Sequence, residues 1–188
     1  MSKKDSDLDL ELWMDKEIIL RQNKLKHEFW NILSETANSF SSEEIKTIHK
    51  TSRGAKLTKG NNLAGFPYQV LDISRDFNPE NGLNIRVLNW FGHGMFIFIL
   101  LGKNHPKKLD DAFIDTGFKF CLTNSEWDYK RLIQKDSATQ NPKDSEVDPS
   151  KVVQWMLQLT PTSSSTDTIT MLRDKIKKVF NLLGSHLG

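Results

Sequence analysis

The residues of this chain best suited to acid–base chemistry are His93, which lies between Gly92 and Gly94, and Asp72. Imidazole gains and loses a proton near neutral pH, so His93 is a candidate general base. Asp72 ends an apolar stretch and is the second candidate for moving a proton. Flanking glycines also allow a tight hairpin turn, which explains the same pattern without catalysis. No serine or cysteine lies close to His93 in the sequence, so no nucleophile is assigned.

The same region contains side chains that could hold an anion. Arg86 lies in an alternating pattern and could face Asp72 across a sheet. The planar fork of an arginine binds carboxylates and phosphates, although an Asp–Arg pair more often only neutralises polar groups at a sheet edge. Both interpretations stay open. The candidate ligand-binding residues are Lys59, Tyr68, Arg75, Arg86 and Trp90.

Aromatic side chains suggest a possible apolar cleft. Trp90 and Phe91 end a predicted strand and cannot both point into one core, so one ring should lie on the opposite face of the sheet. Phe66, Tyr68, Trp90 and Trp127 could frame a cleft of the kind that binds small molecules. Packing within the core explains these rings equally well.

A basic run crosses the end of a predicted helix. Lys46, Lys50 and Arg53 have helical spacing, and Lys56 and Lys59 follow them. A solvated helix face is the default interpretation, and a site for an anion or a nucleic-acid backbone is the alternative. The formal net charge of +2 argues against a dedicated nucleic-acid-binding protein.

The sequence predicts neither a metal site nor a cofactor site. The five histidines are dispersed, and none has a zinc-like spacing to another ligand. Lys59-Gly60-Asn61 lacks the spacing of a phosphate-binding loop. Cys121 lies between apolar neighbours and is predicted to be a small buried hydrophobe rather than a catalytic thiolate.

Two adjoining apolar runs fix the expected architecture. Leu83, Ile85 and Val87 alternate with polar residues, which is the period of a strand with one buried face. The run 95–101 is apolar at every position and suits a central strand covered on both faces. Strands joined by a short turn pair in antiparallel fashion, so these two should form the centre of the sheet.

The remaining elements follow from periodicity and capping signals. Helices are predicted at 8–37, from Ser41 to Gly54, near 109–114, and from a cap at Asp167 to Gly184. Further strands are predicted at 67–73, 119–123 and 128–133, with an irregular connection at 60–65. Residues 151–159 alternate like a strand, but Asp148-Pro149 could instead open a helix. Residues 137–150 are predicted to be a mobile surface loop.

The expected fold is a single α+β domain spanning residues 1–188. It has a mainly antiparallel sheet, an N-terminal helical hairpin and a C-terminal amphipathic helix packed on the sheet. The longest apolar run has seven residues, whereas a membrane span needs roughly 20. The charged N-terminus and the single cysteine favour the cytoplasm.

The segment Gly65–Asp72 (GFPYQVLD), with Arg75, Phe77, Arg86 and the run Trp90-Phe91-Gly92, resembles an uncharacterised family of bacterial cytoplasmic proteins. The resemblance covers about residues 56–127. It implies a fold and a compartment, and no activity or catalytic residue.

Two functions are compatible with these patterns. The first is a non-enzymatic ligand-binding or protein-interaction domain, which uses the aromatic cleft or a homo-oligomer face. The second is an enzyme for a small anionic substrate, in which arginines hold the anion and His93 or Asp72 moves a proton.

Overall fold

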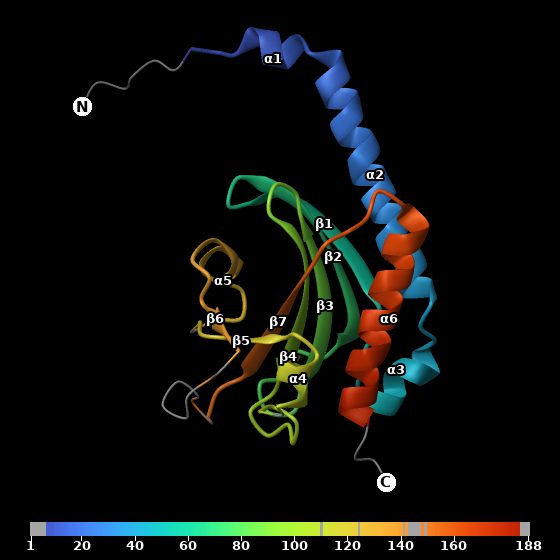
Figure 1. Ribbon diagram of the computed structural model, residues 1–188, viewed down its shortest axis with the longest axis vertical. Helices are drawn as coiled ribbons and strands as arrows, with labels where there is room; N and C mark the ends of the chain where they lie inside the picture. Colours follow the sequence, from blue (N-terminus) through green and yellow to red (C-terminus); the bar gives the residue numbers. More distant parts are fainter. Residues whose placement is uncertain are drawn as a thin grey trace, which may run out of the picture.

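The computed structural model describes residues 7–109, 111–123, 125–140, 142, 148 and 150–184, and its centre is one antiparallel sheet (Figure 1). Within these residues the sheet has seven strands, in the spatial order β1-β2-β3-β4-β7-β5-β6. The strands are β1 (Lys56–Leu63), β2 (Phe66–Arg75), β3 (Leu83–Trp90), β4 (Gly94–Leu101), β5 (Lys119–Cys121), β6 (Ala138–Thr139) and β7 (Val153–Leu159). The helices are α1 (Leu10–Met14), α2 (Lys16–Asn38), α3 (Ser42–Ile48), α4 (Ala112–Asp115), α5 (Tyr129–Gln134) and α6 (Ser165–Gly184). The predicted α+β class is confirmed.

The predicted central hairpin is β3 and β4. The two strands pair in register from Leu83 opposite Leu101 to Trp90 opposite Gly94. Gly92 and Gly94 have φ values of 82° and 113°, a left-handed conformation that glycine adopts without steric cost. Every residue of β4 after Gly94 is buried, as expected for a strand covered on both faces.

One face of the sheet carries the larger core. The helices α2, α3 and α6 lie on this side (Figure 1). Leu172, Ile176 and Val179 form the buried stripe of α6, which confirms the predicted amphipathic C-terminal helix. They pack with side chains from the central strands, among them Ile97 and Trp155. The N-terminal helices α2 and α3 both contact α6.

The opposite face has a smaller core, which α5 covers. Tyr129 and Leu132 of this helix pack against a cluster that includes Trp90 and Phe98. The strand predicted at 128–133 is therefore wrong. Asp128 caps the helix by accepting a hydrogen bond from the Arg131 N–H, and Tyr129 and Leu132, three residues apart, are both buried.

Strand β1 occupies the segment predicted as an irregular connection. It is an edge strand with mostly exposed residues, so it lacks the apolar alternation that reveals a half-buried strand. Gly60 leaves room for the Tyr68 ring of the neighbouring strand, since a Cβ atom at this position would lie 2.5 Å from that ring. Ala64 and Gly65, with φ values of 51° and 95°, turn the chain into β2.

The capping box that opens α3 is confirmed, but the helix ends earlier than predicted. The Glu44 N–H donates to Ser41 Oγ at 3.1 Å, and the Ser41 N–H donates to Glu44 Oε2 at 2.9 Å. His49 leaves the helix with φ at −156°, and its Nε2 lies 2.8 Å from Asp76 Oδ2. Lys50 and Arg53 therefore do not share a helix face with Lys46.

The boundaries of the first and last helices also differ from the prediction. The N-terminal helix is interrupted at Asp15, whose carboxylate accepts the Ile18 N–H at 2.9 Å and begins a new helix. At the other end of the chain, Ser164 Oγ rather than Asp167 caps α6, because it accepts the Asp167 N–H at 3.2 Å.

The ambiguous segment 151–159 forms a strand, β7, which pairs with β4. In the predicted mobile loop 137–150, Ala138 and Thr139 form the short strand β6 beside β5. Residues 141, 143–147 and 149 of that loop lie outside the described residues.

Because Ile97 is fully buried in β4 while Leu109 is 44% exposed in the loop before α4, substitution by alanine should have different effects at the two sites. Ile97→Ala is expected to lower the free energy of unfolding by about 2–5 kcal/mol. Leu109→Ala should change it by less than about 0.5 kcal/mol. Urea denaturation measures both, and equal effects would contradict the position of β4 between two cores.

Candidate functional site

The predicted pairing of Asp72 and Arg86 is present. The two residues lie directly opposite each other on β2 and β3. Arg86 Nε donates to Asp72 Oδ1 at 2.7 Å and Arg86 Nη2 donates to Oδ2 at 3.0 Å, which is a bidentate ion pair. Asn84 Nδ2 also donates to Asp72 Oδ1 at 3.0 Å. Both ionised side chains are largely buried, with 12% and 6% of their surfaces exposed.

The remaining surface of the Arg86 guanidinium is also occupied. Its Nη1 donates to the Tyr129 hydroxyl at 2.7 Å, and the rings of Trp127 and Phe77 lie 4.8 and 5.6 Å from its central carbon. Burial opposes the charge, but the hydrogen bonds and charge of Asp72 outweigh it and raise the pKa of Arg86. Burial also raises the pKa of Tyr129, against the influence of Arg86. This cluster favours the structural interpretation, because an anion would have to displace Asp72.

Of the four aromatic residues predicted to frame one cleft, Trp127 lies apart from Phe66 and Trp90, whose rings both contact His93, with centroids 4.7 and 3.8 Å from its ring. Trp127 packs on Phe77 near Arg86, with ring centroids 5.6 Å apart. Trp90 is fully buried, and its Nε1 donates to the Leu63 carbonyl at 3.0 Å. Since Tyr68 pairs with Trp90 at the far end of β2 and β3, about 13 Å of extended chain separates this pair from Arg86.

His93 lies at the tip of the β3–β4 hairpin and lines a cavity of about 420 Å³. Its ring stacks on Trp90 with centroids 3.8 Å apart, and its Nε2 is 2.8 Å from the Gln134 amide nitrogen. Lys119 and Asp136, which form an ion pair at 3.5 Å, line the same cavity. Among the described residues that line it there is no serine, threonine, cysteine or arginine. The described lining of this cavity therefore contains a possible base without a hydroxyl or thiol nucleophile and without an arginine.

The other two candidate ligand-binding residues do not join these groups. Lys59 lies with its ammonium 5.1 Å from the Trp30 ring of α2, on the helical side of the sheet. Arg75 Nη2 donates to the Arg53 carbonyl at 3.2 Å, and its Nε is buried without a partner among the described residues. The structure brings Asp72 and Arg86 together and leaves His93, Lys59 and Arg75 apart from them.

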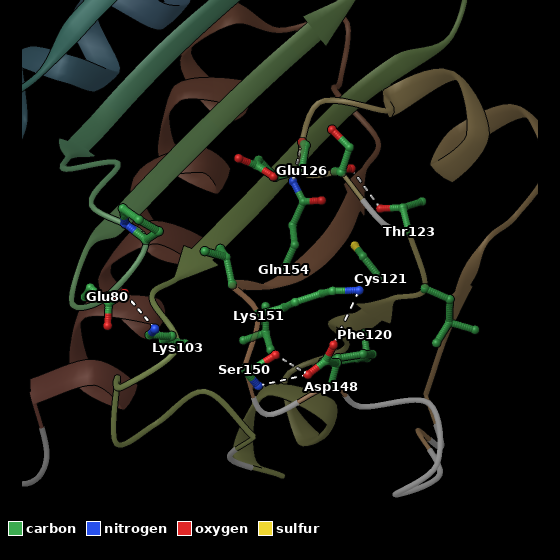
Figure 2. A pocket seen from close by; sticks show the side chains of 15 residues that line it. Glu80, Lys103, Phe120, Cys121, Thr123, Glu126, Asp148, Ser150, Lys151 and Gln154 are labelled. Atoms are coloured by element: carbon green, nitrogen blue, oxygen red, sulfur yellow. Dashed lines mark hydrogen bonds and ion pairs between the residues drawn. The ribbon is translucent and has the colours of Figure 1, made fainter.

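A cavity that the sequence did not reveal lies where β5 and β7 meet the loops around them (Figure 2). Its volume is about 660 Å³. Gln154 Nε2 donates to the Glu126 carbonyl at 3.1 Å, whereas its Oε1 is buried with no partner in the described part of the chain. Lys103 and Lys151, also in the lining, are paired with Glu80 at 2.7 Å and Asp148 at 3.4 Å. This cavity could accept a small polar molecule that donates a hydrogen bond to Gln154.

Cys121 lines this cavity but is not a nucleophile. The side chain is 6% exposed, and burial raises the pKa of its thiol, so the sulfur stays protonated at neutral pH. The predicted small buried hydrophobe fits this environment.

Three polar side chains near the end of α3 resemble a catalytic triad by type only. His49 Nε2 lies 2.8 Å from Asp76 Oδ2 and 2.9 Å from Thr51 Oγ1. In a working triad the acid and the nucleophile contact opposite nitrogens of the histidine. Here both contact the same nitrogen, and the Thr51 hydroxyl donates to Asp76 itself at 2.8 Å. The cluster fastens α3 to the β2–β3 turn.

The most unusual surface is the N-terminal helical arm, defined as residues 8–28. Within it only Asp15 and Lys26 are partly covered, and the remaining residues are exposed. Figure 1 shows α1 and the first half of α2 extending beyond the sheet. Thirteen large apolar side chains are exposed among the described residues, and nine of them belong to the arm. They are Leu8, Leu10, Leu12, Trp13, Met14, Ile18, Ile19, Leu20 and Leu25.

The arm joins the rest of the domain, described residues from 29 onward and called the body below, near Lys26. The Lys26 carbonyl accepts a hydrogen bond from Gln69 Nε2 at 2.7 Å, and the Phe29 ring meets Phe91 edge-on at 6.0 Å. From Ile32 onward, α2 becomes buried against the core. One continuous helix thus has a packed half and an uncovered half.

Comparison with known proteins gave no match: no protein-family model, curated protein or solved structure is similar to this chain. Within the described ranges, no helix is both long and apolar enough to cross a membrane. In the same part of the chain, no three His, Cys, Asp or Glu side chains come together as a metal site.

Removing one partner of the buried ion pair should be costly. Asp72→Asn is expected to lower the free energy of unfolding by about 3–5 kcal/mol, because it leaves the Arg86 charge buried without a counter-ion. Asp174→Asn removes the partner of Arg173 in an exposed pair on α6 and should cost less than about 0.5 kcal/mol. Chemical denaturation compares them, and a small effect of Asp72→Asn would contradict the structural role of the pair.

His105 should make stability depend on pH. Burial lowers its pKa below 6.5, and the charges of His49 and Lys107 lower it further. Its Nδ1 accepts the Lys107 N–H at 3.2 Å, a bond that protonation would remove. The unfolded chain takes up this proton near pH 6.5, and the folded chain does so only at lower pH, so the free energy of unfolding should fall as the pH drops below about 6.5.

Urea denaturation at pH 7.5 and pH 5.5 measures this loss. His105→Asn should reduce the difference between the two values, while His27→Asn, on the exposed side of the arm, should leave it unchanged. An undiminished loss in His105→Asn would assign the pH dependence to other groups.

Proposed function

We propose that this chain is a non-enzymatic protein-interaction domain whose arm binds another polypeptide. The observation that carries the proposal is the concentration of exposed apolar side chains on a helix that stands clear of its own core. Soluble proteins rarely leave a contiguous apolar surface uncovered unless it is an interaction site.

The free energy of burying apolar side chains favours a partner that covers the arm. Burial of one leucine or isoleucine side chain contributes roughly 1.5–3 kcal/mol, so several arm residues together supply enough free energy for a specific interaction. Isolated helices shorter than about 12–15 residues are marginal in water. A partner surface would therefore stabilise both α1 and the free half of α2. Binding of an apolar helix face to a complementary surface is a common mode of recognition.

The alternative of an enzyme for a small anionic substrate fits the geometry less well. It needs an arginine that is free to bind an anion beside His93 or Asp72, whereas Arg86 is held by Asp72 and Tyr129, and Arg75 contacts the Arg53 carbonyl. A small polar ligand in the cavity beside Gln154 is compatible with an interaction domain. A cytoplasmic location is part of the proposal, and the single, free and buried Cys121 suits a reducing compartment.

Site-specific photo-crosslinking in the cells of origin tests the proposed function. A photoreactive residue in place of Leu20, which is 67% exposed on the arm, is expected to form covalent adducts with a polypeptide identifiable by mass. The same residue in place of Leu109, 44% exposed outside the arm, should form none. If both positions gave the same adducts, or neither gave any, the arm would not be the binding surface.

A further inference from the structure

We infer that the polypeptide covering the arm is a second copy of this chain, and that the two arms pair side by side in antiparallel orientation. This inference rests on the proposed function and adds the identity of the partner. Two kinds of observation support it, which are the shape of the free half of α2 and the distribution of charge along the arm.

The surface of α2 has the shape that receives side chains from a facing helix. A hollow of about 510 Å³ is lined by residues of α2 alone: Ile18, Arg21, Gln22, Lys24, Leu25 and Glu28. Residues 18, 21, 22 and 25 have the spacing i, i+3, i+4, i+7, and residues 21, 24, 25 and 28 repeat it. Such a diamond of four residues forms the hole into which a knob of a neighbouring helix inserts. A side chain of a facing helix can therefore occupy the hollow.

The apolar floor of the hollow matches the side chains that a second arm would present. Ile18 and Leu25 lie seven residues apart, and they are 38% and 45% exposed. In a two-fold symmetric pair, the same surface patch of each copy contributes both the knobs and the holes. Ile18 and Leu25 can thus be covered by apolar residues of the partner's arm.

The charges of the arm favour the antiparallel orientation. Residues 8–17 contain four acidic residues and one basic residue, whereas residues 18–28 contain three basic residues and one acidic residue. A parallel pair would place like charges beside each other. An antiparallel pair places the acidic start of each arm along the basic segment of the other, and such complementarity fixes the orientation of a pair of helices.

The position of the arm allows this arrangement. Because the arm extends beyond one end of the sheet (Figure 1), an antiparallel pair would place the two bodies at opposite ends of the paired helices. The sheets and the helix α6 of the two copies would then stay apart. The interface would consist of the arms themselves.

Sedimentation of the full-length chain tests self-association. The wild-type protein is expected to form a dimer, and Ile18→Gln/Leu25→Gln should weaken the dimer at least tenfold while the melting temperature of the body is retained. Leu109→Gln, which replaces an equally exposed leucine outside the arm, should sediment like the wild type. A wild-type monomer at every accessible concentration, or equal dimerisation of the arm variant, would overturn the inference.

Charge reversal tests the pairing. Glu11→Lys/Glu17→Lys makes the arm largely basic, and Arg21→Glu/Lys24→Glu makes it acidic. Each variant alone should dimerise at least tenfold more weakly than the wild type, and an equimolar mixture of the two should recover dimers. Failure of the mixture to recover would exclude pairing through these charges.

Spin labels distinguish the orientations. With a label at His27→Cys, near the end of the arm that joins the body, in a Cys121→Ala background, an antiparallel pair should place the two labels more than about 25 Å apart, because each residue adds 1.5 Å along a helix. A parallel pair would place them about 10 Å apart, the spacing of packed helices, and would overturn the inferred orientation.

These results separate the two proposals. A monomer in sedimentation together with an adduct between Leu20 and a different protein would refute the second copy and leave the interaction domain standing. If the protein sedimented as a monomer and Leu20 gave no adduct, both the second copy and the interaction domain would be refuted.

Discussion

The pairing of β3 with β4 is the constraint on which the rest of the structure depends. Residues 95–101 are apolar at every position, so this strand is stable only where both faces of the sheet are covered. The helices α2, α3 and α6 cover one face, and α5 covers the other. On the second face, the bidentate pair of Asp72 and Arg86 reaches Tyr129, so a buried charge in the sheet is neutralised by the same cluster that holds the covering helix.

The helices of the body thus cover both faces of the sheet, and the arm is not needed to cover it. The buried residues of α2 are Ile32, Leu33 and Thr36, all in its second half. The first half continues the same helix beyond the body and retains apolar side chains at Ile18 and Leu25. Apolar side chains on a helix segment that contacts no core of its own chain are not buried when that chain folds, so they contribute no free energy of burial. Their burial needs a second molecule, and this is why we assign the interaction to the arm.

The sequence predicted the elements whose apolar pattern is strong. The β3–β4 hairpin, the amphipathic helix α6 and the capping box at Ser41 depend on local periodicity and local hydrogen bonds, and all three are present. Strand β1 was missed because an exposed edge strand has no such periodicity. Helix α5 was mistaken for a strand because it is short, and its burial against Phe98 is a tertiary effect.

The candidate site was less predictable because most of its contacts depend on tertiary structure. The pairing of Asp72 with Arg86 followed from alternation along two strands. What could not be read from sequence was that Tyr129 and Trp127, more than forty residues away, would occupy the remaining guanidinium surface. The cavity beside Gln154 combines side chains from several distant segments. The apolar stripe of the first helix was visible, but its periodicity could not show that only the second half would meet the sheet.

Amide hydrogen exchange along α2, followed as a function of protein concentration, tests the central claim most directly. If two arms cover each other, the amides of residues 19–25 should become protected as the concentration rises through the dissociation constant of the dimer, while β4 stays protected throughout. Rapid exchange of these amides at every concentration, with β4 still protected, would show that the arm remains uncovered and would contradict the account.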